Sequence, residues 1–423
     1  MKKNMILFLM FIMQISISAQ LETSKFDNYE KKKEILNRFH NASEFYSLSH
    51  SFLEIPLNRK ERTFNITDEM NSQQIKLSYS AKSTLLEPSF TDHEDVFLLP
   101  FRKYYDSKHT LYHDFTAKIY RENGSLLQNI EGLDNPNMKI SPSGNFIIST
   151  SSFTGDDERK FEFVELHNGG TINHPLNLDK KYSFYADYLT DDHVIIIVQS
   201  KEYKVLNNRR KRDYTSAKIV IYNLSMKKIM MEKDLSTLNG DMVISKSNFN
   251  RALDIERYEN KIAFCGFVLQ NGRTTSFPNY LAVMDYDGNV VSEKRLLLNE
   301  NERTGIQDIK IIKNKILYSK YSKNNTEVLL HDYYVGETLL VKKLKKKFGV
   351  IISHAIFANY DKEILFQLKS NDLESTGLNC FDLENRVNYR YGSNSKVLKS
   401  ELNNTILVKE NNNLSIYKGK NEK

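Results

Sequence analysis

Residues 193–199 read His-Val-Ile-Ile-Ile-Val-Gln, and this stretch decides the fold. The five residues from Val194 to Val198 are all β-branched, and such side chains favour the extended backbone of a strand. The run does not alternate between apolar and polar residues, so we expect the strand to be covered on both faces of its sheet. The stretch therefore predicts a strand inside a stack of sheets.

Six more apolar runs of this kind recur at a mean spacing of about 52 residues, close to the ~40 to 50 residues of one propeller blade. They begin at Asp95, Asn145, Lys261, Lys315, Glu363 and Thr405. Evenly spaced units favour radial repetition of one small sheet over a β-sandwich, which is the alternative. We therefore expect an all-β protein with a β-propeller fold of seven blades.

Each apolar run is followed by a second run that ends at a reverse turn. Three of these turns carry Asn123-Gly124, Asn168-Gly169 and Asp287-Gly288. Because glycine accepts the positive φ of a tight turn, the sequence predicts two-residue hairpins at these places.

The last unit, residues 396–419, holds only three strand-like runs, whereas a propeller blade has four strands. Residues 62–67 and 74–80 read as strands, and we expect one of them to complete this blade and so remove an exposed edge. The propeller would then occupy residues 60–423. Six blades plus an N-terminal cap is the alternative if residues 60–80 do not pair with the last unit.

The N-terminus has the pattern of a secretory signal peptide over residues 1–19. Lys2 and Lys3 precede the apolar stretch from Met5 to Met13, and Ala19 suits cleavage. The stretch is shorter than the ~20 residues of a membrane-spanning helix, which makes an uncleaved anchor the less favoured alternative. We expect an exported protein, periplasmic or extracellular, and not an integral membrane protein.

Residues 20–59 differ from the repeats, and we expect a helical or irregular segment there. Ser24 followed by Asp27 is typical of a helix N-terminus, and apolar residues at helical spacing predict a helix from Lys25 to about Phe39.

The end of the signal peptide, Ser18-Ala19-Gln20, and the abundance of Lys, Asn and Ile resemble exported proteins of Bacteroidetes-type bacteria. The stretch 141–145, Ser-Pro-Ser-Gly-Asn, is similar to the Ser-Pro-Asp-Gly turn of bacterial propeller repeats. The chain thus resembles a secreted bacterial β-propeller repeat protein, with no closer family indicated. The Trp-Asp signature of WD40 blades is excluded, because the sequence contains no Trp.

The sequence contains no nucleophile-elbow, phosphate-loop or zinc-protease motif, and we expect no catalytic residues, no cofactor and no metal. His109 and His113 have the spacing of helical metal ligands, but residues four apart on a strand lie ~13 Å apart. The acidic stretches 92–95 and 155–158 fit solvated turns, and Asp285–Asn289 fits a hairpin better than a calcium loop.

The two cysteines, Cys265 and Cys380, lie two repeat units apart. A disulfide needs Cα atoms within ~7 Å, so we expect two free, buried thiols.

A basic cluster lies in what reads as a long connection of the third unit. It comprises Arg209, Arg210, Lys211 and Arg212. The third unit is also the longest, and long loops on a rigid scaffold often carry recognition. This cluster is therefore the candidate contact for a partner. A second cluster, residues 342–347, fits an edge strand protected by lysines.

These features support a fold more strongly than an activity. We expect an exported, non-catalytic β-propeller that serves as a protein-binding or scaffold module, for example as an accessory subunit of an envelope or outer-membrane assembly. The alternative is a glycan-binding or glycoside-cleaving propeller, which would need carboxylates and tyrosines that converge at one place. No nucleic acid partner is expected for an exported protein of modest net charge, +7 before cleavage.

Overall fold

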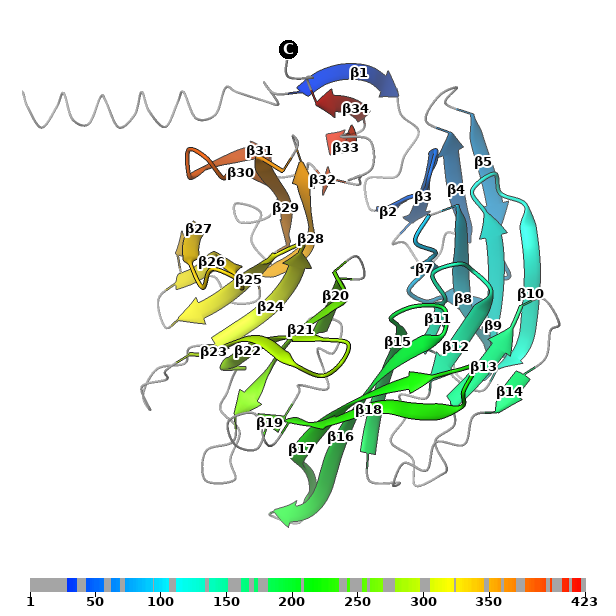
Figure 1. Ribbon diagram of the computed structural model, residues 1–423. Coiled ribbons are helices and arrows are strands. Elements are labelled where there is room, and N and C mark those ends of the chain that lie inside the picture. The colour runs from blue at the N-terminus through cyan, green and yellow to red at the C-terminus, as the bar shows by residue number, and fades with distance from the viewer. Residues whose placement is uncertain are drawn as a thin grey trace, which may run out of the picture. The chain divides into compact units, whose positions relative to one another are not determined.

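The computed structural model shows a protein built of strands (Figure 1). The residues it describes are 29–35, 43–56, 62–68, 73–93, 95–105, 112–133, 137–150, 161–166, 171–173, 182–206, 209–235, 242–243, 253–256, 259–268, 278–296, 305–322, 325–345, 350–358, 361–369, 377–392, 396–397, 405–410 and 413–419. The chain divides into two compact units: unit 1 comprises residues 1–41 and 314–423, and unit 2 comprises residues 42–313. Within the described ranges, no helix is both long and apolar enough to cross a membrane.

Eight sheets of four or five strands make up the described structure, and unit 2 holds five of them. The first sheet orders β2 (Ser43–Ser47), β3 (Ser51–Pro56), β4 (Thr63–Asp68) and β5 (Gln74–Ser78). The second orders β6 (Ser83–Leu85), β8 (Val96–Tyr104), β9 (Tyr112–Arg121) and β10 (Leu126–Leu133), with β7 (Ser89–Phe90) also paired to β8. The third orders β11 (Asn137–Ile140), β12 (Phe146–Thr150), β13 (Phe161–Glu165) and β14 (Thr171–Asn173).

The other two sheets of unit 2 follow the same plan. One orders β15 (Tyr182–Tyr188), β16 (His193–Leu206), β17 (Arg209–Asn223) and β18 (Lys228–Asp234). The next orders β19 (Met242–Val243), β21 (Lys261–Val268), β22 (Tyr280–Asp285) and β23 (Val290–Arg295), with β20 (Leu253–Glu256) also paired to β21.

Three sheets remain. One orders β24 (Gly305–Ile312), β25 (Lys315–Ser322), β26 (Asn325–Asp332) and β27 (Thr338–Lys345). Another orders β28 (Ile351–Ala358), β29 (Glu363–Lys369), β30 (Gly377–Asp382) and β31 (Val387–Gly392). The last joins both ends of the chain in the order β32 (Lys396–Val397), β33 (Thr405–Glu410), β34 (Asn413–Gly419) and β1 (Tyr29–Ile35).

All seven apolar runs of the sequence form the second strand of a sheet, and the runs that follow them form the third. Val194 to Val198 of β16 are at most 1% exposed, as expected for a strand covered on both faces. In the sheet of β8, Phe97 packs with Phe64 on one face, while its neighbour Leu98 packs with Ile147 on the other. The prediction of stacked sheets is confirmed.

The expected count of seven blades is not supported. Six of the described sheets consist of consecutive strands from a single unit, which is the number in the six-bladed alternative. Of the other two, one combines β24 of unit 2 with strands of unit 1, and one combines β1 with strands from the end of the chain. The sequence did not indicate the sheet of β2 to β5, because polar residues interrupt its apolar runs. Glu54 of β3 and Asn65 of β4 are both buried, and the Asn65 amide donates to the Glu54 carboxylate at 2.7 Å. This hydrogen bond lets polar residues occupy a core position.

An N-terminal strand completes the last sheet, as expected, but the strand is β1. It pairs antiparallel with β34, from Tyr29 opposite Gly419 to Ile35 opposite Leu414. The stretches 62–67 and 74–80 had been expected to provide this strand, yet they supply β4 and β5 of the first sheet.

The predicted helix from Lys25 to Phe39 is not found, because residues 29–35 form β1, and the remainder of that stretch lies outside the described residues. Pairing with the edge of a sheet outweighs a local helical pattern here.

The glycines of two predicted turns have positive φ, +79° at Gly124 and +87° at Gly288. The loops are longer than the expected two residues: Gly124 N–H donates to the Arg121 carbonyl, and Arg121 N–H donates to the Ser125 carbonyl. This is a three-residue hairpin in which the left-handed residue is glycine. The Asn168-Gly169 turn lies outside the described residues.

Candidate functional site

The residues weighed as metal ligands do not form a centre in the described structure. His109 and residues 155–158 lie outside the described residues, and His113 lies on β9. Asp95 accepts a hydrogen bond from the Thr91 hydroxyl at 3.1 Å and so closes its own turn. No group of three or more His, Cys, Asp or Glu side chains among the described residues could hold a metal ion.

The Asp285–Asn289 stretch is a hairpin turn, as the sequence indicated. The Asp285 carboxylate accepts hydrogen bonds from the N–H groups of Asp287 and Asn289 and from the Asn289 amide. Burial alone would raise the pKa of Asp285, but these hydrogen bonds lower it. The Asp285 carboxylate therefore stabilises the turn through these hydrogen bonds.

The basic cluster lies on a strand and not in a loop. Arg209 to Arg212 begin β17, which pairs with β16 as far as Leu206 opposite Arg209. The neighbouring strands end earlier: β15 pairs with β16 only up to Ser200, and β18 pairs with β17 only from Lys218. The extra length of the third sequence repeat, which begins at His193, thus forms a two-stranded arm, residues 201–214. The arm extends beyond the sheet of β15 to β18 (Figure 1).

The arm places like charges opposite each other. Lys204 pairs with Lys211, and Glu202 pairs with Asp213. Residues 201–214 contain six basic and two acidic residues. Like charges directly opposite on paired strands destabilise a hairpin, and a two-stranded ribbon alone is marginally stable in water.

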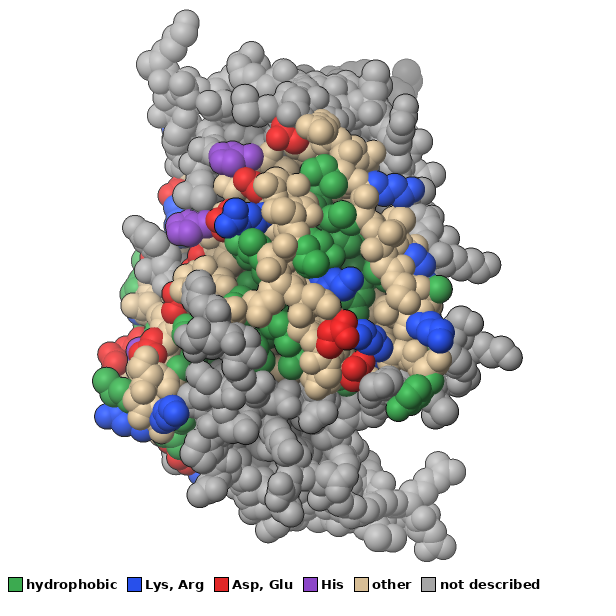
Figure 2. Space-filling view, turned by 90° about the vertical axis from the view of Figure 1, so that its right-hand side faces the viewer, with side chains coloured by type: hydrophobic (Ala, Val, Ile, Leu, Met, Phe, Trp, Pro, Cys, Tyr) green, Lys and Arg blue, Asp and Glu red, His purple; other side chains and the backbone are tan. Residues whose placement is uncertain are grey.

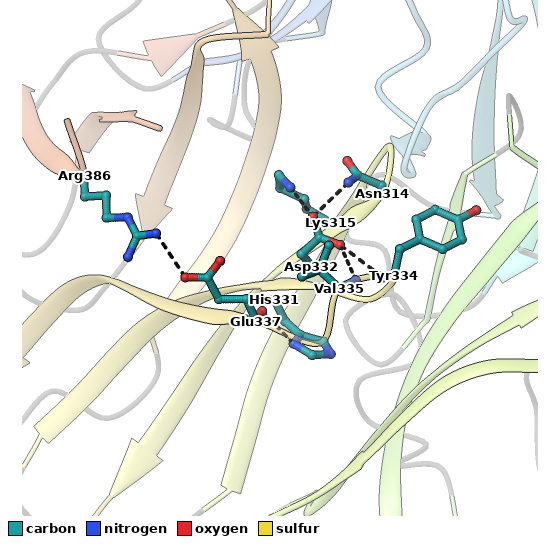
Figure 3. A network of polar contacts seen from close by, with 8 residues as sticks. All are labelled: Asn314, Lys315, His331, Asp332, Tyr334, Val335, Glu337 and Arg386. Carbon is teal, nitrogen blue, oxygen red and sulfur yellow. Dashed lines mark hydrogen bonds and ion pairs between the residues drawn. The ribbon is translucent and has the colours of Figure 1, made fainter. Parts of the chain in front are cut away.

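The turn between β26 and β27 displays apolar side chains on a rigid support (Figure 3). Tyr334 is 59% exposed and Val335 is 76% exposed. The Tyr334 ring lies 4.8 Å from the ring of the buried Tyr333. Arg386, from the turn between β30 and β31, forms an ion pair at 3.1 Å with Glu337 next to this turn.

Asp332 holds the β26–β27 turn in place (Figure 3). Its carboxylate accepts hydrogen bonds from the N–H groups of Tyr334 and Val335, and from the side chains of Asn314 and Lys315. Burial opposes ionisation, yet the hydrogen bond from Lys315 and those from the turn lower the pKa of Asp332. The turn is therefore preorganised.

Another apolar surface lies on the side of unit 2 that carries β5 and β10. Figure 2 shows hydrophobic side chains gathered near the middle of this face, with charged side chains around them. Leu126 and Leu127 of β10 are 50% and 45% exposed, and Ile75 and Leu77 of β5 are partly buried in the adjoining core. Exposed leucines of this kind are common on protein surfaces.

A third feature, which the sequence did not reveal, is a group of ionisable side chains in unit 2 that lie on the first strands of several sheets or, for Glu87, between β6 and β7. We call it the first-strand cluster. Its members are Glu87, Lys139, Tyr185, Asp187, Asp254, Asp308 and Lys310. Contacts join these first strands in two groups: β11 contacts β7 and β15, and β20 contacts β24.

One half of the first-strand cluster centres on Asp187 of β15. The Tyr185 hydroxyl donates to the Asp187 carboxylate at 3.1 Å, and the Lys139 ammonium group of β11 lies 3.9 Å from the same oxygen. The side chains of Lys139 and Asp187 are 25% and 14% exposed, so both remain accessible to a ligand.

The other half centres on Asp254 of β20. Its carboxylate accepts from the N–H of Ile311 at 2.8 Å and lies 3.4 Å from the Lys310 ammonium group. Asp308, also on β24, is buried. The Asp254 charge foremost, followed by Asp308 and Glu87, raises the pKa of Lys310 against the effect of its burial.

Tyr185 belongs to the half around Asp187. Burial raises its pKa well above the usual value, and the charges of Asp187, Glu87 and Asp254 raise it further. A sequence signal exists, because aspartate is depleted in strands, yet Asp187, Asp254 and Asp308 all sit within apolar strand sequence.

No family model and no curated protein matches this chain. Among solved structures it is similar to the Dos1 propeller, with a TM-score of 0.52 and 11% identity, over 92% of this chain and 96% of that one. It is also similar to the C-terminal WD40 domain of Sif2, with a TM-score of 0.51 and 11% identity, over 92% of this chain and 98% of that one. The chain has a β-propeller fold. At this identity the likeness concerns the propeller fold alone, which this sequence reaches without any tryptophan.

Proposed function

We propose that this β-propeller is an exported, non-catalytic protein-binding or scaffold module that uses the β16–β17 arm to hold its partner. The observation that supports the proposal is the arm itself: among the described residues, 201–206 and 209–214 pair only with each other, and residues 201–214 carry a net charge of +4. Such a ribbon is costly to keep ordered by itself, and a partner would supply the missing contacts. An accessory role in an envelope or outer-membrane assembly of a bacterium fits the predicted signal peptide and the resemblance of the N-terminus to exported bacterial proteins.

The charge of the arm suggests the chemistry of the partner. A protein with an acidic surface would relieve the repulsion between Lys204 and Lys211 and attract the arm from a distance. Arg209, Arg210 and Arg212 add planar guanidinium groups, which bind carboxylates with two parallel hydrogen bonds.

Crosslinking and affinity purification of the full chain from its native cells test this proposal. We expect a specific envelope protein with the wild type, and its loss with the variant R209T/R210T/K211T/R212T. Threonine is β-branched and favours a strand, and the substitution removes the charge. The control K76T/K228T/K343T/K345T removes four exposed lysines elsewhere and should retain the partner.

Salt provides a second readout, because exposed charges are screened over ~10 Å at 0.1 M ionic strength. The partner should dissociate as ionic strength rises. A partner that stays bound to the arm variant, or a chain that is monomeric and unaccompanied in native cells, would contradict the proposal.

Export has its own test. Mass spectrometry of the protein from native cells should find a mature N-terminus at Gln20, after cleavage behind Ala19. An intact Met1 on the mature protein would argue against the signal peptide.

Glycan binding is a second candidate function, and the first-strand cluster favours it. Asp187 and Asp254 offer acceptors, while Lys139, Lys310 and Tyr185 offer donors, which suits the alternating hydroxyls of a sugar. Binding of any oligosaccharide by the purified chain is the test of this candidate.

A further inference from the structure

We propose that Met226 and Met230, here called the methionine pair, are a modification site at which hydroperoxides oxidise the surface of the protein without unfolding it. The pair belongs to the sheet of β15 to β18: one methionine lies in the turn between β17 and β18, and the other lies on β18. β18 pairs with residues 218–223 of β17, whereas the arm comprises residues 201–214. The proposal therefore does not depend on the partner of the arm.

The first step concerns exposure. Met226 is 60% exposed and Met230 is 47% exposed, and Ile229 between them is 43% exposed. Methionine oxidation needs access of the oxidant to the sulfur, so exposed thioethers are the ones at risk. Together with the isoleucine, the methionine pair forms a small apolar surface on the outside of unit 2.

A β-bulge accounts for the exposure of two successive side chains on β18. Ile221 of β17 lies opposite Met231 and Tyr222 lies opposite Ile229, so Met230 between them has no partner on β17. In a regular strand, successive side chains point to opposite faces of the sheet, and a bulge changes this alternation. Ile229 and Met230 are both exposed as a result.

The third step is the contrast with the other methionines whose side chains the structure describes. Met231 is only partly exposed, and a Cβ atom placed on Gly288 would lie 3.2 Å from its sulfur, so the turn between β22 and β23 covers this thioether. Met138 and Met284 are buried, at 3% and 0% exposure. The fold thus leaves the methionine pair open and covers these three thioethers.

The reaction requires only the sulfur and a hydroperoxide. With hydrogen peroxide, the sulfur lone pair attacks one peroxide oxygen, an S–O bond forms and the O–O bond breaks. The sulfur loses two electrons and the peroxide gains them. The departing hydroxide takes the proton from the transferred oxygen and leaves as water. The product is methionine sulfoxide, which methionine sulfoxide reductases convert back to the thioether.

Oxidation of the methionine pair would change the surface and not the core. A sulfoxide is polar, and at an exposed position its oxygen stays hydrated, so the free energy of unfolding should change little. At Met284 the same oxygen would be buried without a hydrogen-bond donor provided for it, which is destabilising. The methionine pair is therefore a place where an oxidant makes β18 more polar while the propeller stays folded.

A time course with hydrogen peroxide on the purified full chain, followed by mass spectrometry of its peptides, tests the selectivity. We expect the methionine pair to be oxidised at least about tenfold faster than Met138 and Met284, because buried thioethers react only after local opening. In denaturant all four methionines should react at similar rates, which is the control. Equal rates in the folded protein would overturn the proposal.

Hydrophobic interaction chromatography tests the effect on the surface. Oxidised wild type should elute earlier than untreated protein, and treatment with a methionine sulfoxide reductase should restore its retention. The variant M226L/M230L keeps the apolar surface but offers no sulfur at these positions, so peroxide should shift its retention less. Thermal unfolding of the oxidised wild type should match that of the untreated protein. An equal shift of wild type and variant, or unfolding of the oxidised wild type but not of the treated variant, would contradict the proposal.

Discussion

Lys342 shows how one buried charge responds to its surroundings. It lies on β27, and its ammonium group donates to the Asn379 side chain of β30. Burial foremost, and the charge of Arg390, lower its pKa to about 8. In the unfolded chain a lysine has a pKa of about 10.4. Between these values the unfolded state binds more protons than the folded state.

Stability should therefore rise with pH across this window, by at most about 1.4 kcal/mol per pH unit. The variant Lys342→Met has no charge to lose, so its free energy of unfolding should rise less steeply between pH 8 and pH 10. Urea unfolding at several pH values measures the two slopes. Lys343→Met, an exposed lysine on the same strand, is the control and should keep the wild-type slope.

At the scale of elements, several turns between the third and fourth strands of a sheet are stabilised in the same way by an aspartate. Asp285, Asp332 and Asp382 each end a third strand and accept hydrogen bonds from N–H groups of the following turn. A carboxylate in this place satisfies backbone donors that the sheet leaves open. In the sequence, an acidic residue at the end of an apolar run indicates a turn stabilised in this way.

We predict that Asp332→Ala destabilises the protein by about 1–3 kcal/mol, because it leaves the Lys315 ammonium group and two turn N–H groups without their acceptor. Asp382→Ala removes a comparable cap without a lysine partner and should cost less. Denaturant unfolding compares the two variants. Equal losses would mean that the contact with Lys315 adds nothing.

The closing strand β1 provides a second test at this scale. A chain that begins at residue 29 keeps all of β1, and a chain that begins at residue 36 lacks it. We expect the shorter chain to unfold at a lower temperature and to aggregate, since β34 loses its neighbour and becomes an exposed edge. Light scattering during thermal unfolding reports both effects. Identical behaviour of the two chains would show that the pairing of β1 contributes nothing to stability.

At the scale of the whole molecule, each compact unit contains one buried thiol. Cys265 lies in unit 2 and Cys380 in unit 1, and both are free, as the sequence predicted. Burial, and then the charge of Asp308, raise the pKa of Cys265. A buried thiol with a raised pKa provides almost no thiolate for reaction.

We predict that neither thiol reacts with a disulfide reagent in the native protein, and that each reacts when its own unit unfolds. The single-cysteine variants C265A and C380A allow each unit to be followed separately as denaturant is raised. Circular dichroism of the same samples is the control for unfolding. Rapid reaction of either thiol in the folded protein would contradict the burial described here.

The local pattern of the chain was enough to place seven second strands and seven third strands. Apolar runs such as 194–198 can only be covered on both faces, and Gly124 marks a turn because of the φ it accepts. These properties depend on neighbouring residues in the chain. They establish a repeated small sheet and therefore the β-propeller.

The tertiary structure decided what depends on residues far apart in the chain. Only pairing in space shows that β1 completes the last sheet, and that the buried pair of Glu54 and Asn65 belongs to a further sheet. The ion pairs of the first-strand cluster likewise join residues about one repeat unit apart in the chain: Lys139 lies 3.9 Å from Asp187, and Lys310 lies 3.4 Å from Asp254. The physical reason is that neighbouring residues in the chain indicate which side chains are buried. Strand pairing and electrostatic attraction, by contrast, act between whichever groups the fold brings together.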